Sequence, residues 1–383
     1  MHYYLAMTSK CNLLCKYCYG KTTEDFLTEE EKENYDLDLP ADMNFKIDEL
    51  KKFASYDKDF ELTFYGGEPL MKIEEIKQIM DTIPAKTFML QTNGQFLHKL
   101  PSEYMNKIHT ILVSLDGTRE HTNERRGNKV YEKIIQNLNL IRENEFTGEI
   151  IARMTVDETS DVYENVVSLL ENKEFKFSSV HWQLDAQFWR ADYFERDFNG
   201  WAITKYNPKV KKLIEWWIQE MKTKGIVHKI YPFLGILESI RARELQSYRA
   251  SELPVMKCGS GFSLLGIQTN GKVAACPITA GYKPFYMGDI RTSTLKDVEA
   301  NKIYPDNTCS TCEILDICGG RCLYANKTKL WGQKGFDETC DTIFFLVNQL
   351  KTKMPEIDKL IENKKIKKED FEYLKYNGCE IIP

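Results

Sequence analysis

Six short apolar runs recur through the first half of the chain, and helix-like segments separate them. The runs read YYLAMT, FELTFYGG, TFMLQTNG, HTILVSLDG, EIIARMTVD and VHWQLDAQF. In the intervening segments, such as KIEEIKQIMDTI, apolar residues recur every three or four positions, as on a helix with one buried face. Strands that alternate with helices of this size pair in parallel through right-handed crossovers. The pattern predicts an α/β fold, a partial or full (β/α) barrel, with its active site at the carboxyl ends of the strands.

The chain is long for one core, since 383 residues allow two or more folded units. We expect the barrel in residues 1–200. A helical bridging region follows in 201–255, and its helical stretch reads NPKVKKLIEWWIQEMKTKG. Residues 256–345 contain most of the cysteines and form a further expected domain. A helical tail is predicted for 346–383.

Charge and hydropathy exclude two classes of partner. The 52 basic and 57 acidic residues give a net charge of -5 and are interleaved, which provides no basic surface for nucleic acid. No stretch is long and apolar enough for a membrane span. The first residues, MHYYLAMTSK, lack the features of a signal peptide. The sequence therefore predicts a cytoplasmic protein that binds neither nucleic acid nor membrane.

The cysteines fall into two groups with a long gap between them. Three of the eleven lie at positions 11–18, seven at 258–340, and Cys379 stands alone. In a chain without a secretion signal this is no disulfide framework, because cytosolic thiols stay reduced. Metal or cluster ligation is the leading explanation.

The first group, Cys11, Cys15 and Cys18, has the spacing C-x3-C-x2-C and no fourth ligand nearby. A tetrahedral zinc site would want that fourth ligand, although a distant residue can supply it. Three thiolates on a [4Fe-4S] cluster leave one iron open to a reactant.

This loop, CNLLCKYC, resembles the cluster loop of the radical S-adenosylmethionine (SAM) superfamily, which follows the first strand of a TIM-like partial (β/α)6 barrel. The segments GGEP, QTNG, SLDG and ERRG resemble further motifs of that family. The resemblance implies the following SAM-contacting residues: Tyr17, Gly66, Gly67, Glu68, Pro69, Asn93, Ser114, Asp116 and Arg126. Read alone, GGEP is also a β-α turn, Arg126 a surface arginine and Tyr17 a core residue.

The second group is similar to the seven-cysteine SPASM extension of peptide- and protein-modifying radical SAM enzymes, an iron-sulfur domain at the C-terminal side of the barrel. The resemblance implies three [4Fe-4S] clusters in all. Auxiliary cluster II would be held by Cys309, Cys312, Cys318 and Cys340. Auxiliary cluster I would be held by Cys258, Cys276 and Cys322. Sulfatase-maturing members supply a further cysteine where this chain has Leu264, so that iron is open, or Cys379 or another arrangement completes the site.

The family implies a chemistry in which reductive cleavage of SAM yields a 5'-deoxyadenosyl radical. We expect modification of a ribosomally made peptide or protein, with Cys-to-carbon thioether formation as the specific product. An alternative is oxidation of Ser or Cys to formylglycine, which Pro277 disfavours because those enzymes have an aspartate there. A non-catalytic electron carrier or cluster scaffold is the alternative from another class.

Asp185, after the sixth strand, is a candidate catalytic residue and is equally compatible with a helix cap. The expected partners are the peptide or protein substrate and a reductant such as ferredoxin or flavodoxin. A separate peptide-recognition protein is a further expected partner.

Overall fold

The computed structural model describes residues 1–18, 32–188, 191–244, 256–374 and 382–383. Within these ranges no helix is long and apolar enough to cross a membrane. The chain divides into two compact units. The first comprises residues 1–115, 119–151 and 258–304, and the second comprises 116–118, 152–257 and 305–383. Cys379 lies outside the described residues.

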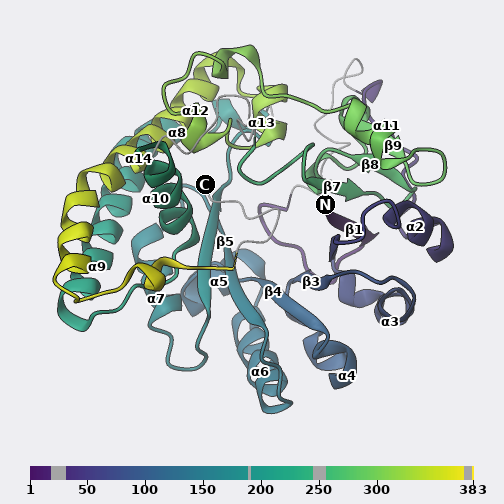
Figure 1. Cartoon of the computed structure of the whole chain (residues 1–383), viewed down its shortest axis with the longest axis horizontal. Helices are drawn as coiled ribbons and strands as arrows, with labels where there is room; N and C mark the ends of the chain where they lie inside the picture. Colours follow the sequence, from purple (N-terminus) through teal and green to yellow (C-terminus); the bar gives the residue numbers. More distant parts are fainter. Residues whose placement is uncertain (19–31, 189–190, 245–255, 375–381) are drawn as a thin grey trace. The chain divides into compact units, whose positions relative to one another are not determined.

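The first unit is built on parallel strands that follow one another along the chain (Figure 1). The strands are β1 (His2–Thr8), β2 (Glu61–Gly66), β3 (Thr87–Thr92) and β4 (Ile108–Ser114). Their order is β4-β3-β2-β1, with His2 of β1 opposite Glu61 of β2. The side chains of Leu5, Phe64 and Val113 are fully buried. Parallel strands buried on both faces read as the apolar runs seen in the sequence.

Helices cover the outer face of these strands (Figure 1). They are α2 (Ile47–Ala54), α3 (Ile73–Thr82), α4 (Ser102–Met105) and α6 (Val130–Glu143), and α5 (Arg119–Arg126) precedes α6 along the chain. In α3, the buried side chains Ile76, Ile79 and Met80 recur at helical spacing. The strand-helix alternation predicted from sequence is confirmed.

Three further strands of the first unit were not predicted. They are β7 (Leu264–Ile267), β8 (Lys272–Ala274) and β9 (Tyr286–Asp289). Strand β7 pairs in parallel with β1, and Leu264 lies opposite His2. Strands β8 and β9 continue the sheet in antiparallel fashion, and α11 (Leu295–Ala300) follows them. Part of the cysteine-rich sequence therefore extends the sheet that contains β1.

The remaining predicted strands are also present. Strand β5 (Glu149–Val156) runs across the boundary between the units, and β6 (Ser179–Leu184) belongs to the second unit. In the second unit, Trp182 of β6 and the rings of Trp217 and Phe233 form an edge-to-face cluster. All three side chains are fully buried. Aromatic packing of this kind contributes beyond the buried area alone.

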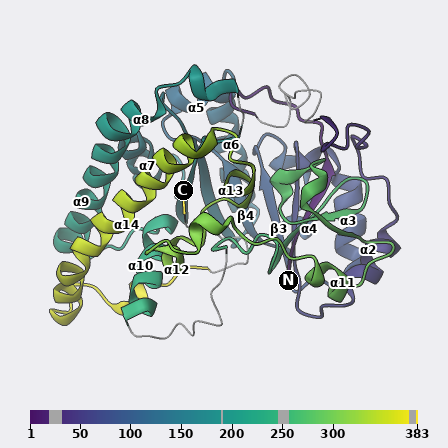
Figure 2. The same cartoon turned by 90° about the horizontal axis from the view of Figure 1, so that it is seen from above.

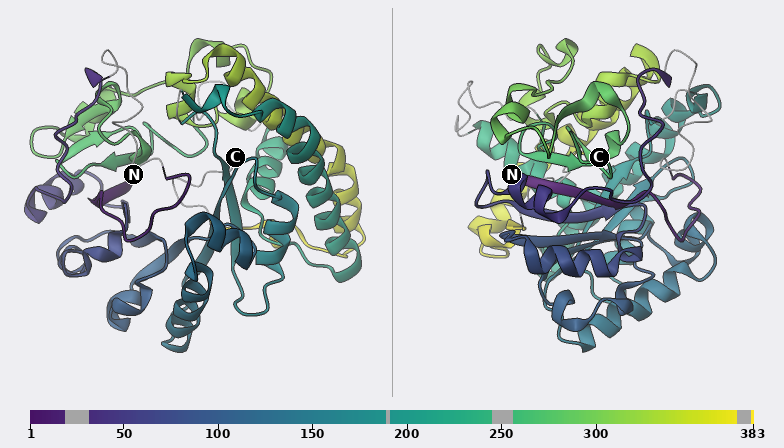
Figure 3. Two further views of the ribbon diagram at one scale, coloured as in Figure 1. Left: turned by 180° about the vertical axis from the view of Figure 1, so that it is seen from behind. Right: turned by 90° about the vertical axis from the view of Figure 1, so that its right-hand side faces the viewer.

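Most of the second unit is helical. Its helices are α7 (Val162–Leu170), α8 (Phe198–Trp201), α9 (Asn207–Lys224), α10 (Tyr231–Glu244), α12 (Leu315–Cys318), α13 (Leu323–Thr328) and α14 (Gly332–Glu362). Helices α9 and α14 lie side by side in every view (Figures 2 and 3). Helix α9 ends at Gly225, whose φ of 67° closes the helix in the left-handed region.

The long C-terminal helix begins earlier than the sequence predicted. We expected a helical tail in residues 346–383, whereas α14 already starts at Gly332 and includes Cys340. Phe336, Ile343 and Val347 lie on its buried face, so the apolar periodicity runs through the cysteine. Because the segment before residue 346 was assigned to the cysteine-rich domain, this periodicity was not interpreted as part of the helix.

Candidate functional site

The three N-terminal cysteines lie on the loop that leaves β1. Cys11, Cys15 and Cys18 are each partly exposed. The N–H of Cys18 donates to the carbonyl of Cys15 at 3.2 Å, which turns the loop back on itself. The N–H of Lys16 donates to the carbonyl of Arg125 at 3.0 Å, which anchors the loop to α5. These two backbone hydrogen bonds fix the loop that carries the three cysteines at the carboxyl end of β1.

Asn93, at the carboxyl end of β3, connects this loop to the sheet. Its Nδ2 donates to Cys11 Sγ at 3.6 Å and to Asn12 Oδ1 at 2.8 Å. The side chain is 7% exposed. The resemblance implied that Asn93 contacts SAM, and the structure places it against the cluster loop.

The glycine pair after β2 packs against the backbone that leaves β1. The N–H of Gly67 donates to the carbonyl of Thr8 at 2.8 Å. A Cβ on Gly66 would lie 2.2 Å from the Thr8 oxygen, and one on Gly67 would lie 2.3 Å from the Lys10 oxygen. Only glycine permits this approach. The pair therefore fixes the start of the cysteine loop.

Glu68 is fully buried and receives three hydrogen bonds from the structure around it. Its Oε1 accepts from the Leu70 N–H at 3.0 Å and from Thr92 Oγ1 at 2.8 Å, and its Oε2 accepts from the Asn93 N–H at 2.8 Å. Burial raises the pKa of Glu68 to about 7, and these donors oppose the rise. The carboxylate thus braces the GGEP turn, which ends in the 3-10 helix Pro69–Met71, against β3.

Two arginines hold the aromatic residue of the cysteine loop. The guanidinium carbons of Arg125 and Arg126 lie 4.3 Å and 5.3 Å from the centre of the Tyr17 ring. Both arginines are buried, so Arg126 is not the exposed helix-entry arginine that the sequence also allowed. Arg125 was not predicted, since ERRG offers two arginines and nothing in the sequence favours the first.

The other predicted residues of the barrel lie at strand ends. Ser114 is the last residue of β4. Asp116 is fully buried, and its Oδ1 accepts from the Thr155 N–H at 3.0 Å. Asp185 follows β6, and its Oδ2 lies 3.8 Å from Nη1 of Arg196. Its role therefore includes an ion pair with an arginine that also binds Glu158 at 2.9 Å.

Cys258 and Cys276 belong to the first unit and flank β7 and β8. Cys258 Sγ lies 3.1 Å from Ser260 Oγ, and the Gly261 N–H donates to the carbonyl of Ala275 at 2.8 Å. This backbone contact joins the two cysteine-bearing segments. Leu264 is 3% exposed and lies inside β7, so its side chain belongs to the core.

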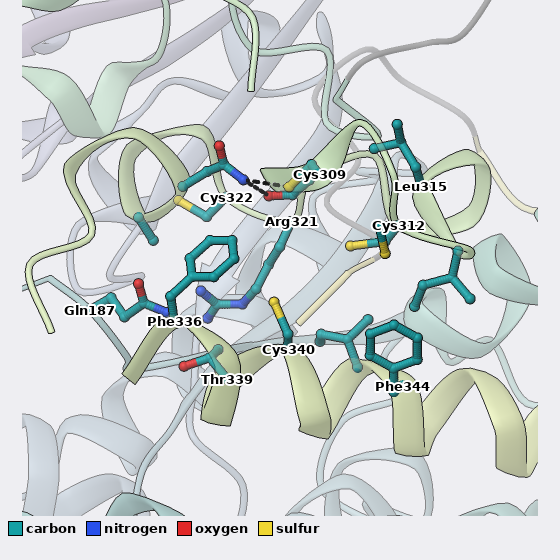
Figure 4. Close-up of a pocket in the computed structure, with 16 residues that line it drawn as sticks. Gln187, Cys309, Cys312, Leu315, Arg321, Cys322, Phe336, Thr339, Cys340 and Phe344 are labelled. Carbon is teal, nitrogen blue, oxygen red and sulfur yellow. Dashed lines mark hydrogen bonds between the residues drawn. The ribbon is translucent and has the colours of Figure 1, made fainter. Parts of the chain in front are cut away.

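Five cysteines of the second unit line one pocket, which we call the cysteine pocket (Figure 4). They are Cys309, Cys312, Cys318, Cys322 and Cys340. The resemblance assigned Cys322 to a different cluster from the other four. Hydrophobic side chains, among them Ile314, Leu315 and Phe344, also line the pocket.

The environment of the cysteine pocket favours neutral thiols in the absence of a cation. Burial raises the pKa of Cys318 to about 11 and that of Cys340 to about 12, with repulsion among the thiolates as a further cause. Asn326 was not predicted, although its Nδ2 donates to Cys309 Sγ at 3.2 Å. Thiolates that burial disfavours are stabilised by a bound metal, which deprotonates a coordinating thiol.

The cysteine side chains have the donor chemistry that iron-sulfur clusters require. Within the described ranges, no three His, Cys, Asp or Glu side chains converge closely enough to hold one metal ion. A [4Fe-4S] cluster does not need such convergence, because each thiolate binds a different iron. Amide donors to the sulfur atoms of Cys11 and Cys309 are contacts that cluster ligands commonly receive.

The first part of the chain is similar to a known family of sequences. Residues 5–167 match the family model of the Radical SAM superfamily. The chain is 24% identical over 369 residues to the radical SAM cyclopropyl synthase TigE of Paramaledivibacter caminithermalis. That alignment covers 90% of this chain and 73% of the relative.

Solved structures share the fold. Native anSMEcpe with bound AdoMet (SAM) has a TM-score of 0.68 at 17% identity, over 95% of this chain and 100% of that chain. The same protein with AdoMet and the Cp18Cys peptide has a TM-score of 0.67 at 17% identity, over 95% and 99% of the two chains. Streptococcus suis SuiB bound to S-adenosylmethionine has a TM-score of 0.54 at 14% identity, over 84% and 70%. The predicted partial (β/α)6 barrel with a cysteine-rich C-terminal part is confirmed.

Proposed function

We propose that this chain, whose residues 5–167 form a radical SAM domain, is a radical SAM enzyme that modifies a side chain of a peptide or protein. The observation that carries the proposal is a set of hydrogen bonds that joins the carboxyl ends of β1, β2 and β3. There Asn93 donates to Cys11, and Gly67 donates to the strand end that leads into the cysteine loop. Hydrogen bonds of this kind hold a cluster loop and a SAM-binding turn in one fixed geometry.

In this proposal Cys11, Cys15 and Cys18 hold a [4Fe-4S] cluster. SAM bound there supplies a 5'-deoxyadenosyl radical, which abstracts hydrogen from an unactivated carbon. The protein positions SAM with residues around the same strand ends. Those assigned to it are Tyr17, Gly66, Gly67, Glu68, Pro69, Asn93, Ser114, Asp116 and Arg126. Arg126 suits the SAM carboxylate, because a guanidinium binds carboxylates through paired donors.

The other cysteines hold two auxiliary clusters in this proposal. Cys309, Cys312, Cys318 and Cys340 fit a fully ligated cluster, because all four line one pocket. Cys258, Cys276 and Cys322 are assigned to a second cluster with one position left for another ligand. Leu264 cannot fill that position, since its side chain is apolar and buried in β7.

A peptide substrate is supported by the fold shared with anSMEcpe, which has been solved with a bound peptide. We assign thioether formation between a cysteine and a carbon as the product, with the substrate thiol at the open auxiliary position. A second candidate is cyclopropane formation, which the match to TigE over 90% of the chain favours. Formylglycine formation is disfavoured, because this chain has Pro277, which has no acid or base group, where sulfatase-maturing enzymes have an aspartate. A ferredoxin or flavodoxin is the proposed reductant, and a separate peptide-recognition protein is a further proposed partner.

The first test is SAM cleavage by the anaerobically reconstituted chain with dithionite. We expect 5'-deoxyadenosine from the natural chain and none from Cys15→Ala. The matched control is Cys340→Ala, which removes a thiol from the cysteine pocket and should retain SAM cleavage in the absence of peptide. Retained cleavage in Cys15→Ala would contradict the loop assignment.

The second test identifies the product with a cysteine-containing peptide encoded beside the gene for this chain. Thioether formation and cyclopropane formation both remove two hydrogens, but only the thioether consumes the peptide thiol. Mass spectrometry after alkylation separates them. A product that has lost two hydrogens and still takes the alkyl label would favour the cyclopropane and exclude the thioether.

A further inference from the structure

Arg321 is a buried charged side chain in the cysteine pocket that the assignments above do not use. It is 8% exposed, and its guanidinium lies among the cysteine side chains (Figure 4). Nε donates to the carbonyl of Pro383 at 2.9 Å and Nη2 to the carbonyl of Leu184 at 3.5 Å. Nη1 is buried and has no hydrogen-bond partner among the described residues. A buried guanidinium donor without an acceptor is costly.

The backbone that carries Arg321 is also unusual. Gly319, Gly320 and Arg321 follow Cys318 with φ angles of 68°, 95° and 60°. Glycine adopts such angles freely, whereas a residue with a side chain is strained there. An arginine at the third position therefore sets its side chain between Cys318 and Cys322 at a conformational cost.

The negative charge of a cluster in this pocket would provide an acceptor for Nη1. Four thiolates on a [4Fe-4S] cluster give a net charge of roughly -2, which becomes about -3 on reduction by one electron. Among the described residues that line the pocket, Arg321 carries the only formal positive charge. The guanidinium of Arg321 and the side chain of Cys340, a proposed ligand, line the same pocket (Figure 4). Hydrogen bonds and charge near the sulfur atoms set the potential of such clusters.

We propose that Arg321 is a positioning residue that donates from Nη1 to a sulfur atom of the cluster held in this pocket and raises its reduction potential. The inference rests on the cluster assignment made under the proposed function. The reduced cluster is the more negative form, so a fixed cation and a donor stabilise it more than the oxidised form. The same side chain, through Nε and Nη2, joins the cluster to the end of β6 and to Pro383.

The test uses the full chain in a background that confines iron to the cysteine pocket. The substitutions Cys11→Ala, Cys15→Ala, Cys18→Ala, Cys258→Ala and Cys276→Ala leave all five pocket cysteines in place. About four iron atoms per chain are expected after reconstitution. Arg321→Met is then compared with Arg321→Lys and with Arg241→Met. Arg241 is a matched control, because it is a partly exposed arginine of the same unit that pairs with Asp358.

The midpoint is measured by dithionite titration followed by electron paramagnetic resonance. Arg321→Met should make reduction at least tenfold less favourable, a fall of about 59 mV for one electron. Arg321→Lys should shift the midpoint less, because it keeps the charge, and Arg241→Met should leave it unchanged. Thermal unfolding, measured in parallel, separates a lost structural contact from a change in potential.

A second readout works even if Arg321→Met does not fold. After exchange into D2O, the deuterons coupled to the reduced cluster are detected by electron-nuclear double resonance, and Arg321→Lys should lose the strongest coupling. Iron loading with an unmoved midpoint and an unchanged coupling would overturn this inference alone and assign Nη1 to a bridging water with the buried Oε1 of Gln187. A background chain that binds no iron would contradict the cluster assignment and this inference together.

Discussion

The two best-defined cysteine sites of the molecule are built in opposite ways. The loop after β1 gathers Cys11, Cys15 and Cys18 within eight residues and depends on neighbours such as Asn93 and Arg125 to hold it. The cysteine pocket draws its thiols from a longer stretch, so that Cys309 and Cys340 come from different elements. The first site is local in sequence and partly exposed, and the second depends on how several helices pack.

This contrast suits two different tasks. In the proposed function, SAM must reach an open iron at the first site, and backbone contacts such as that between Gly67 and Thr8 hold the loop there. A fully ligated cluster, proposed for the second site, would need no such access, and apolar side chains such as Ile314 and Phe344 line that pocket. Burial raises the pKa of Cys318 and Cys340, so without a bound cation these two thiols stay protonated.

The largest expected effect is that of iron removal. Chelation should release the segment around Cys309 and Cys318, because the proposed cluster would tie four thiols from several elements together. We expect amide exchange there to rise about a thousandfold, or about 4 kcal/mol of local stability. The loop after β1 should change less than tenfold, since Lys16 keeps its backbone bond to Arg125. Hydrogen exchange with mass spectrometry, with and without iron, measures the exchange rates of both segments. Equal changes in the two would contradict the difference proposed between the two cysteine sites.

Next in size is the effect of closing the glycine contact. Gly67→Ala places a Cβ 2.3 Å from the Lys10 carbonyl oxygen, a backbone atom that cannot move without the cysteine loop. We expect a loss of roughly 3 kcal/mol in unfolding free energy, together with loss of SAM binding. Denaturant unfolding and calorimetry measure these quantities.

Gly332→Ala is the control for this substitution. Its Cβ would meet nothing within 4 Å, although the φ of 67° disfavours alanine. It should cost about 1 kcal/mol and leave SAM binding intact. If Gly67→Ala behaves in the same way, the loop is not held by this contact.

The contrast also explains what the sequence could reveal. The six strands and the cluster loop were predictable because their signals are local, as in the apolar run that contains Phe64 and the spacing of Cys11, Cys15 and Cys18. Strand β7 was missed, because a four-residue strand is defined by its partner β1 and not by its own pattern. The start of α14 was not predicted, because Cys340 was interpreted as a ligand of the cysteine-rich domain and not as part of a helix.

Residues that act through tertiary contacts were beyond prediction. Arg125 stacks on Tyr17, and Asn326 donates to Cys309, from positions that no motif singles out. Arg321 was not singled out either, since its burial and its left-handed backbone appear only in the fold. Glu68 was predicted to contact SAM, and its three internal hydrogen bonds became evident only in the structure.

A smaller effect concerns thiol reactivity in the metal-free chain. With a pKa of about 12, Cys340 is almost entirely protonated at pH 8. Because the thiolate is the nucleophile, its alkylation should be at least a hundredfold slower than that of glutathione, or about 2.7 kcal/mol. Iodoacetamide labelling with peptide mapping measures the rate, and labelling in denaturant is the control. Reaction at the rate of a free thiol would show that the pocket does not exclude water.

The smallest expected effect tests the hydrogen bonds by which Glu68 joins the GGEP turn to β3. The pKa of Glu68 is about 7 in the folded chain and lies near 4.5 when unfolded, so its contribution to stability is fully present below pH 4.5 and is lost as the pH rises through 7. Between pH 5 and pH 7 the loss is about 2 kcal/mol. Glu68→Gln cannot titrate, so its stability does not fall in this way between pH 5 and pH 7. Its side chain has an amide NH2 group in place of one carboxylate oxygen, and that group cannot accept the hydrogen bond from the Asn93 N–H.

The variant should therefore be less stable than the natural chain at pH 5, and the difference should shrink by about 2 kcal/mol at pH 7. Urea unfolding of both chains at the two pH values gives the difference directly. A difference that stays constant would mean that Glu68 is already ionised at pH 5. Its three donors would then outweigh burial, and the carboxylate would carry a full negative charge beside the cysteine loop, where the SAM ammonium group is proposed to bind.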